Sequence, residues 1–451
     1  MAGAASVYGN IPVPEYINSV VEEFPKITKG RAIESSIASR YVTDILPVNL
    51  SSNMRITDQY LEFRIEGVRG AFIDLSKLIL EIKLSLSKSG DQTKLGDDDH
   101  FSFVNGIGNT LFKAVQVYVG DQVCESNPLY SYWSYIKMLT SFSPDSMETL
   151  GALTGFRNDA TKSGSRISTF TTASFTDASD KEKTFMSNCK EHGLHLTFPL
   201  MIDMASSDQY LLDGVNVRIR LEMAKQEWFL NGEANVADVR CNVDFATLHV
   251  TRLCPYPSAL NSLNKALGAG TGRVTRTVFN KTLSKQLVLA RGQTSLTSDL
   301  PFGQVIPERL YCIIVPMPAF AGSYNENGLY FGHHNISEVA LTMNGSVMYN
   351  NSMKFPHECS RVFYQTLEAL GLENKTVLSY DVFKEGHTLF VFNLLPEDLR
   401  NTLPVEQTGN LRLSITLKEG IDKNMIVMLF GDIKSVLSID QSRNVQVDSR
   451  A

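Results

Sequence analysis

The alternation of apolar and polar positions along residues 114–139 predicts a unit made of a β-hairpin, a loop and a helix. Valine occupies every second position from 115 to 119, which is the period of a strand with one buried face. Gly120 and Asp121 then supply a tight turn into a second strand at 122–124. After the loop, a helix carries one broad apolar side formed by Tyr130, Tyr132, Trp133, Tyr135, Ile136 and Leu139. We expect this helix to close the open end of a β-sandwich.

The same unit recurs at residues 339–372. Asn344-Gly345 marks the hairpin turn. The apolar residues that follow at helical spacing are Val362, Phe363, Tyr364, Leu367 and Leu370. A second match supports the first, because an alternating strand begins behind Gly214 and again behind Gly409. Two halves that share an order of elements are typical of a duplicated fold.

Strand-like runs follow one another through both halves, with short turns and few long helices. Besides the hairpin, those of the first half are 60–65, 72–86, 194–199, 214–223 and 241–251. Those of the second half are 274–279, 286–290, 309–315, 339–343, 377–383, 388–394, 411–417, 425–430 and 434–439. Evenly spaced strands predict sandwiches, and two copies of about eight strands fit jelly rolls. We therefore expect an all-β chain with two tandem jelly-roll β-sandwiches (a double jelly roll), short helices in the loops and an N-terminal arm.

Shifts in composition divide the chain into five parts. These are an N-terminal arm (1–54), a first jelly roll (55–254), a linker (255–272), a second jelly roll (273–445) and a C-terminal tail (446–451). The linker is rich in Pro, Gly, Ser and Asn, the composition of a domain junction. A polar stretch at 161–183 is expected to lie outside the core, either as a solvated loop or as an exposed projection.

The N-terminal arm contains one short helical stripe between Pro14 and Pro25. Its apolar residues are Tyr16, Ile17, Val20, Val21 and Phe24. A helix this short is stable only when it buries such a stripe. The stripe packs either on its own domain or, as an inter-subunit contact, on a neighbouring chain, and the sequence leaves both open.

The distribution of charge bears on whether the chain binds nucleic acid or a membrane. The 451 residues carry a net charge of −6, which gives no sign of a chain that neutralises nucleic acid as a whole. Residues 246–298 nevertheless contain no Asp or Glu. Their basic residues line an ordinary solvated strand face, the commoner case, or contact phosphates of a genome or an inner membrane. The candidates are Arg273, Arg276, Lys281 and Lys285.

Signals for secretion, membrane insertion and redox chemistry are weak. No apolar run is long enough to span a membrane, and the N-terminus does not read as a signal peptide. We therefore expect a chain that is neither secreted nor embedded in a membrane. The six cysteines form no C-x-x-C pair, so we expect reduced thiols in the core.

Candidate catalytic chemistry is equally weak. His192 and His195 are expected on opposite faces of one strand, and His333-His334 in a turn, so neither pair predicts a metal site. No nucleophile elbow, zinc-protease helix or phosphate-binding glycine loop occurs in the sequence. We expect no catalytic, cofactor-binding or metal-binding residues and no small-molecule substrate.

An ordered set of segments in both halves resembles the major capsid proteins with a double jelly roll, and most closely those of polinton (Maverick) elements and adintoviruses. In the first half the segments are YLEFRI from Tyr60, FIDLSKLIL from Phe72, VQVYVGD from Val115, YSYWSYI from Tyr130 and LLDGVNVRIRL from Leu211. In the second half they are FAGSYNEN from Phe320, ISEVALTMNG from Ile336, GHTLFVFNL from Gly386, GNLRL from Gly409, and Ile439-Asp440 with RNV from Arg443. The resemblance extends from about residue 60 to about residue 445.

The resemblance implies a non-enzymatic structural protein of a double-stranded DNA virus or an integrated element. Three copies would close into a hexon-like, pseudo-hexagonal homotrimer, and these capsomers would tile an icosahedral virion capsid inside the host cell. The implied partners are other copies of the chain, penton and minor capsid proteins, and genome or inner-membrane phosphates. The arm would lie at the inner face of the shell.

Two other classes remain as alternatives. A jelly-roll module that binds a ligand or carbohydrate needs a concave aromatic site, whereas Trp133 and Trp228 both lie in core-like sequence. A cupin-type enzyme needs clustered metal-binding histidines, and the eight histidines show no such cluster in the sequence.

Overall fold

The computed structural model describes most of the chain. The described residues are 36–50, 54–56, 59–88, 95, 100–157, 167–171, 174–175, 178–232, 238–268, 274–299, 301–352, 355, 357–371, 376–395 and 408–448. Strand accounts for 46% and helix for 23% of the structure, which confirms the predicted all-β class.

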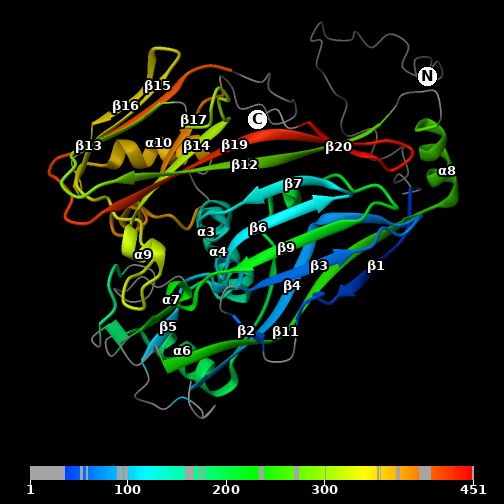
Figure 1. Ribbon diagram of the computed structural model, residues 1–451, viewed down its shortest axis with the longest axis horizontal. Helices are drawn as coiled ribbons and strands as arrows, with labels where there is room; N and C mark the ends of the chain where they lie inside the picture. Colours follow the sequence, from blue (N-terminus) through cyan, green and yellow to red (C-terminus); the bar gives the residue numbers. More distant parts are fainter. Residues whose placement is uncertain are drawn as a thin grey trace, which may run out of the picture.

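The first half supplies the strands of one sandwich (Figure 1). They are β1 (Ile37–Ile45), β2 (Met54–Arg55), β3 (Tyr60–Ile65), β4 (Phe72–Lys88), β5 (Phe101–Phe103), β6 (Phe112–Val119), β7 (Gln122–Asn127), β8 (Leu194–Pro199), β9 (Val217–Met223), β10 (Leu230–Gly232) and β11 (Val239–Pro255). One sheet has the order β1-β11-β4-β8, with β2 paired to β11, and the facing sheet has the order β3-β9-β6-β7. Strands β10 and β5 form a separate short pair.

The second half supplies the other sandwich (Figure 1). Its strands are β12 (Thr275–Leu289), β13 (Ser295–Asp299), β14 (Arg309–Pro316), β15 (Ile336–Met343), β16 (Ser346–Ser352), β17 (Phe390–Asn393), β18 (Leu411–Leu417), β19 (Met425–Ile439) and β20 (Val445–Asp448). One sheet has the order β12-β19-β14-β17, with β20 paired to β19, and the facing sheet has the order β13-β18-β15-β16.

The two sandwiches have the same topology. In each half, we number the eight strands of the two main sheets from 1 to 8 in chain order. In the first half this numbering runs from β1 to β11 and leaves out β2, β5 and β10. In the second half it runs from β12 to β19. One sheet of each half then reads 1-8-3-6 and the other 2-7-4-5. This is the strand order of a jelly roll, so the predicted duplication and the predicted double jelly roll are both confirmed.

Each half also keeps its predicted hairpin. Gly120 between β6 and β7 has φ 57°, and Asn344 and Gly345 between β15 and β16 have φ 51° and 83°. Two successive residues with positive φ are what a tight turn of the I′ type requires, and Asn-Gly is its preferred sequence. The hairpins fix β6 beside β7 and β15 beside β16.

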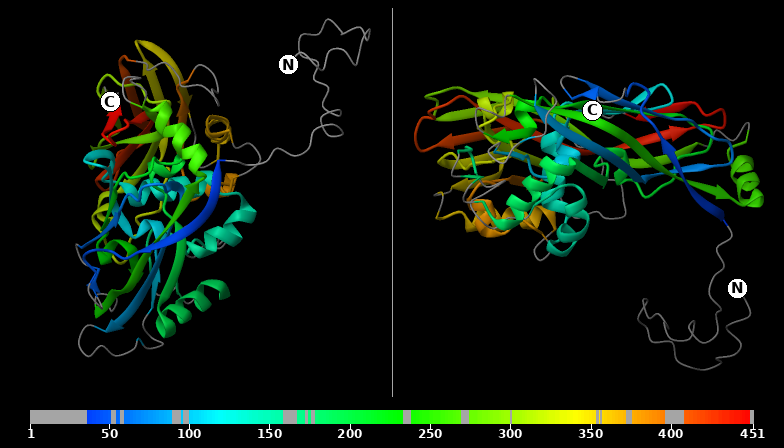
Figure 2. Two further views of the ribbon diagram at one scale, coloured as in Figure 1. Left: turned by 90° about the vertical axis from the view of Figure 1, so that its right-hand side faces the viewer. Right: turned by 90° about the horizontal axis from the view of Figure 1, so that it is seen from below.

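Helices occupy the connections between strands. They are α2 (Ile107–Thr110), α3 (Tyr130–Ser141), α4 (Pro144–Ser146), η1 (Met147–Gly151), α6 (Asp180–His192), η3 (Asp203–Ser206), α7 (Gln226–Phe229), α8 (Pro257–Ala266), α9 (Met317–Ala321), α10 (Ser360–Leu370) and α11 (Tyr380–Lys384). In the right panel of Figure 2, the teal helices of the first half and the orange helices of the second lie on the same side of the sheets. Helix α3 follows β7 and α10 follows β16, so the two helices are equivalent in the two halves.

The sheet β12-β19-β14-β17 is buried on both faces. In β14, Leu310, Cys312 and Ile314 belong to the core of the second jelly roll, whereas Tyr311, Ile313 and Val315 join the core cluster of the first. The equivalent strand β4 alternates instead, with Leu80, Ile82 and Leu84 buried and Ile79, Glu81 and Lys83 at least partly exposed. We call the side of each of these two sheets that points away from its own sandwich core its outer face.

Three predicted boundaries differ from the structure. Strand β1 lies inside the segment 1–54 that was assigned to the arm, yet it pairs with β11. It is an edge strand with exposed Tyr41 and Val42, so it lacks the alternation that marks a half-buried strand. Helix α8, which begins with Pro257 at its first position, lies in the predicted linker, and β20 reaches into the predicted tail.

Some predicted strands also differ. Residues 377–383 do not form a strand, because Ser379 caps the start of α11 by accepting a hydrogen bond from the amide of Val382 at 3.3 Å. The runs 425–430 and 434–439 form one continuous strand, β19. Gly431 lies at their junction, where a Cβ would approach Pro307 to 2.9 Å, so the glycine permits close packing and does not end the strand. The runs 274–279 and 286–290 likewise form one strand, β12.

Candidate functional site: the joint between the two jelly rolls

Helix α3 joins the two jelly rolls. Nine of its twelve residues are buried. Trp133 stacks on Phe430 of β19 with ring centroids 5.3 Å apart, and it meets Tyr311 of β14 edge to face at 5.0 Å. Both partners lie on the outer face of the sheet in the second jelly roll. The helix therefore covers a neighbouring sandwich, and its predicted role of closing its own sandwich is incomplete.

Two further aromatic residues of α3 reach the second half. The hydroxyl of Tyr135 hydrogen-bonds Nε2 of His387 at 2.7 Å, and its ring packs edge-on against Phe331 at 5.9 Å. Tyr132 stacks on Phe320 of α9 at 5.9 Å. We call Tyr132, Trp133 and Tyr135 with these partners the aromatic joint. Each such ring pair contributes about 0.5–1.5 kcal/mol beyond the burial of its area, so the joint is firmly closed.

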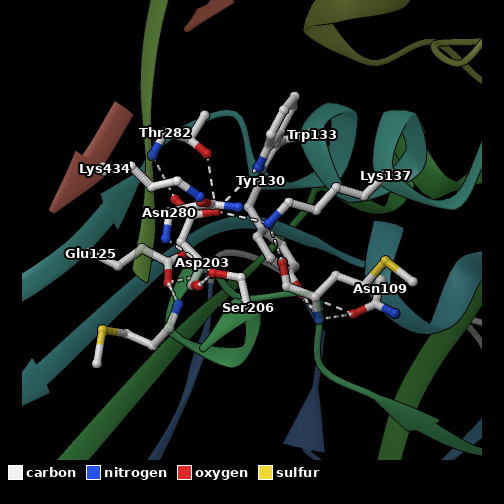
Figure 3. Close-up of polar contacts among 12 residues, drawn as sticks. Asn109, Glu125, Tyr130, Trp133, Lys137, Asp203, Ser206, Asn280, Thr282 and Lys434 are labelled. Carbon is white, nitrogen blue, oxygen red and sulfur yellow. Dashed lines mark hydrogen bonds and ion pairs between the residues drawn. The ribbon is translucent and has the colours of Figure 1, made fainter. Parts of the chain in front are cut away.

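A buried polar cluster lies beside the aromatic joint (Figure 3). Asp203 in η3 is fully buried and accepts a hydrogen bond from Nζ of Lys137 at 2.7 Å. It also accepts from the backbone amide of Thr282 at 2.7 Å and from its hydroxyl at 3.0 Å. Glu125 of β7 accepts from the amide of Asp203 at 2.7 Å. Because Thr282 belongs to β12, the carboxylate of Asp203 ties the second jelly roll to α3.

Two acidic members of this cluster, Glu125 and Asp432, bind protons more tightly than isolated carboxylates do. Burial, and then the charge of Asp203, raise the pKa of Asp432 to about 7. The same two causes raise the pKa of Glu125 well above its usual range. Burial alone would lower the pKa of the Lys137 ammonium. The negative charges of Asp203 and Glu125 have the larger combined effect, so the pKa is raised. We call Glu125, Lys137, Asp203 and Asp432 the carboxylate cluster. Because the pKa values of Glu125 and Asp432 are raised, we expect the joint to bind protons as it forms.

A second contact fixes the C-terminal hairpin to the first jelly roll. Arg443, in the turn between β19 and β20, donates to the carboxylate of Asp213 at 2.6 Å and to its carbonyl oxygen at 2.8 Å. Asp213 also accepts from the amide of Gly70 at 2.8 Å. Arg443 has φ 69°, an unusual conformation for a residue with a side chain, and this two-point contact holds it.

The outer face of β1-β11-β4-β8 carries a row of hydrogen-bonded acidic and histidine side chains. His249 lies between Asp44 at 2.7 Å and Glu81 at 3.1 Å, and His195 lies 2.7 Å from the other oxygen of Glu81. The row crosses all four strands, and we call it the acid–histidine row. Hydrogen bonds from the two histidines lower the pKa of Glu81. Burial opposes the charge of His249, but Asp44 and Glu81 outweigh it and raise its pKa.

The structure places the predicted basic residues on β12 where it describes them. Arg273 lies outside the described residues. Arg276 and Lys285 are exposed and Lys281 is half-buried. The regular pairing of β12 with β19 puts Lys281 and Lys285 on one side of the strand and Arg276 on the other. They do not converge on one phosphate-sized site. The apolar stripe of the arm (Tyr16, Ile17, Val20, Val21 and Phe24) also lies outside the described residues.

In the part of the chain that the structure describes, neither of the two histidine pairs noted in the sequence forms a metal-binding arrangement. His192 ends α6, whereas His195 lies in β8 and joins the acid–histidine row. His334 has φ 43°, which confirms a turn at that pair. Within the described ranges, no group of three or more His, Cys, Asp or Glu side chains has the arrangement of a metal site. In the same ranges, no helix is long and apolar enough to cross a membrane.

Both tryptophans and the cysteines lie where the sequence placed them. Trp133 is 2% and Trp228 6% exposed, which confirms their core-like contexts. All six cysteines are free thiols, and all except Cys254 are buried. Burial raises the pKa of Cys124 to about 12, so this thiol is not a reactive nucleophile.

The sequence did not predict the carboxylate cluster, and Arg443 was noted only as part of a family-like segment, without its contact to Asp213. Glu125, Asp203 and Asp432 are far apart in the chain, and only the packing of the two halves brings them together. One signal was present in the sequence, since Asp432 interrupts a strongly apolar strand directly after Gly431. A lone acidic residue in such a strand indicates a buried polar contact, but it does not identify the partner.

Comparison with known proteins shows similarity at the level of the fold. No protein-family model and no curated protein matches the sequence. A chain of the Sputnik virophage matches with 8% identity and a TM-score of 0.60, over 98% of this chain and 94% of that one. The Faustovirus major capsid protein matches with 9% identity and a TM-score of 0.57, over 96% of this chain and 95% of that one. The mavirus major capsid protein matches with 10% identity and a TM-score of 0.52, over 98% and 97%.

These matches define the class of fold. Each covers nearly the whole of both chains, so the likeness in fold extends over both jelly rolls of this chain. The structure is therefore a double jelly roll of the kind found in major capsid proteins.

Proposed function

We propose that this chain is a major capsid protein, a structural and non-enzymatic subunit of a virion capsid. One observation carries the proposal: two jelly rolls of identical strand order are fixed to each other by buried contacts. A rigid pair of similar sandwiches is the unit from which three copies place six sandwiches around one axis. The fold shared with the Faustovirus and mavirus major capsid proteins supports it.

The proposed assembly is a hexon-like homotrimer with a pseudo-hexagonal outline. Such capsomers tile an icosahedral shell, which forms inside the host cell and encloses a double-stranded DNA genome. Penton and minor capsid proteins complete the shell as partners. The sequence motifs support a relationship to the capsid proteins of polinton elements and adintoviruses.

The arm and the basic strand have proposed places in this shell. The stripe of Tyr16, Ile17, Val20, Val21 and Phe24 packs on a neighbouring subunit at the inner face. Lys281 and Lys285, roughly 13 Å apart along one side of β12, contact phosphates of the genome or of an inner membrane. Arg273 and Arg276 contact other phosphates, Arg276 from the opposite side of the strand. Removal of residues 1–30 is expected to weaken contacts between capsomers and to leave the trimer intact, as sizing of the purified protein will show.

The observed aromatic pocket does not favour a carbohydrate-binding module. A pocket of about 330 Å³ is lined by Tyr132, Trp228 and Phe320. Trp228 meets Tyr132 edge to face at 5.6 Å, and its indole N–H donates to the hydroxyl of Tyr132 at 3.1 Å. The indole ring is thus engaged inside the protein, whereas sugar binding needs an open aromatic face. The same groups help to join the two halves, as the capsid proposal requires.

The mass of the purified full chain in solution tests the proposal. Light scattering behind a sizing column is expected to give about three times the 50.1 kDa of one chain, or larger shells. A sharp monomer peak that persists at high protein concentration would contradict it. In that case a screen of carbohydrate binding becomes the next experiment.

A further inference from the structure

The contact between the two jelly rolls of one chain indicates how two copies of the chain can contact each other. In the first half, α3 lies on the outer face of β12-β19-β14-β17, and β7 lies beside β12 (Figure 1). The equivalent elements are α10 for α3, β16 for β7, and β1-β11-β4-β8 for the sheet. The first set is buried within one chain. Among the residues that the structure describes, the equivalent set keeps exposed side chains on the helix, on the strand and on the sheet face.

Helix α10 carries a row of exposed side chains on one side, as a helix that packs against another surface does. Only three of the eleven residues of α10 are buried: Val362, Thr366 and Ala369. Arg361, Tyr364 and Glu368 are exposed and lie one turn apart on one side of the helix. Tyr364 is 58% exposed. In β16, which precedes α10 in the chain, Val347 is 63% exposed and adds a second apolar side chain to the exposed surface of this half.

The free sheet face is complementary to these side chains. Ile79 of β4 is 38% exposed at its centre, and Val42 of β1, which is 58% exposed, lies on the same face as Asp44. Around Ile79 lies the acid–histidine row, in which Asp44 and Glu81 supply negative charge. Lys83 and Arg40 lie on the same strands as these two acids, so the face also offers positive charge.

We propose that the outer face of β1-β11-β4-β8 binds the free face of α10 and β16 from a second copy of this chain. Tyr364 packs on the apolar patch around Ile79, and Arg361 meets the acid–histidine row. This interface joins two different surfaces, so each copy can use both and a ring of three closes. The inference rests on the proposed capsomer and assigns the residues that hold it together.

The two free surfaces can be blocked one at a time. Tyr364→Glu places a charge on the helix face and Ile79→Glu places one on the sheet face. Each variant is expected to weaken assembly at least tenfold, about 1.4 kcal/mol, since an unpaired carboxylate must be desolvated in the interface. Matched controls are Leu150→Glu and Val288→Glu, because these side chains are 48% and 53% exposed and lie outside the two surfaces. Both controls should assemble like the original chain.

Mixing the two blocked variants is the decisive step. A Tyr364→Glu copy retains its sheet face and an Ile79→Glu copy retains its helix face, so an equimolar mixture should give dimers of about 100 kDa that cannot close into a trimer. Circular dichroism and thermal unfolding serve as controls for the folding of each variant. Normal trimers from both variants, or equal losses in the controls, would overturn this interface while the capsomer stands. A monomeric original chain would instead overturn the proposed function.

Discussion

The two equivalent sheets of this chain meet different surroundings. The outer face of β12-β19-β14-β17 is largely apolar and lies under the aromatic residues of α3. The outer face of β1-β11-β4-β8 carries Glu81, His195 and His249 and is partly exposed. One topology thus supports a buried contact within the chain on one sheet and a partly exposed polar surface on the other. The difference teaches that duplication supplied the geometry, while the residues on each outer face set how permanent its contact is.

The largest expected effect comes from opening the sealed face. Trp133→Ala removes a buried ring from between Tyr311 and Phe430, and we expect it to lower the free energy of unfolding by about 3–5 kcal/mol. Tyr364→Ala, at the exposed face of the equivalent helix, should change it by less than about 0.5 kcal/mol. Urea denaturation of both variants measures the contrast. Equal costs would remove the distinction between the two helices.

The next effect concerns the C-terminal hairpin. Arg443→Ala leaves the buried carboxylate of Asp213 without its cationic partner, and we expect a loss of about 3 kcal/mol in unfolding free energy. Asp213→Asn combined with Arg443→Ala should cost less than the sum of the two single changes, because the unpaired charge is then gone. Additive losses in this double-mutant cycle would show that the pair does not hold the hairpin.

The carboxylate cluster gives a smaller effect that depends on pH. The folded-state pKa of Asp432 is about 7, above its ordinary value of 3.8, so the folded protein holds a proton that the unfolded chain releases. Stability from this group is full below pH 4 and is lost as pH rises to about 7. Between pH 5 and 8 we expect a fall on the order of 2 kcal/mol. Asp432→Asn should flatten this fall, and denaturation curves across that range will show whether it does.

The smallest effect is expected on the open face. Glu81→Gln weakens the acid–histidine row, whose members are partly exposed, so the free energy of unfolding should fall by less than about 1 kcal/mol. Glu222→Gln, which weakens a pair with Lys113 on the other sheet of the same sandwich, is the matched control. Sizing should nevertheless show weaker trimers for Glu81→Gln alone. Identical assembly of the two variants would place the interface elsewhere.

Much of the fold could be predicted because its signals are local. The hairpin at Asn344-Gly345, the helix behind it and the equivalent unit at Gly120 depend on residues a few positions apart. The unbroken apolar run of β14 also carried information, since a strand without alternation is covered on both faces. We predicted this run only as a strand, and the structure shows that α3 covers its second face.

The site could not be predicted to the same degree. Trp133 and Phe430, or Asp203 and Thr282, come together only when the two sandwiches pack against each other. Strand β1 was missed for a related reason, because an edge strand with two exposed sides has no hydrophobic period. The contacts that fix the two sandwiches to each other therefore leave no local signal in the sequence.

Electron microscopy of the purified protein tests the central claim most directly. If the two jelly rolls form one rigid pair whose open surfaces join between copies, particles viewed down their axis will show three chains and six similar lobes in a closed ring. Particles with only two lobes, or pairs related by a two-fold axis through identical surfaces, would contradict the account.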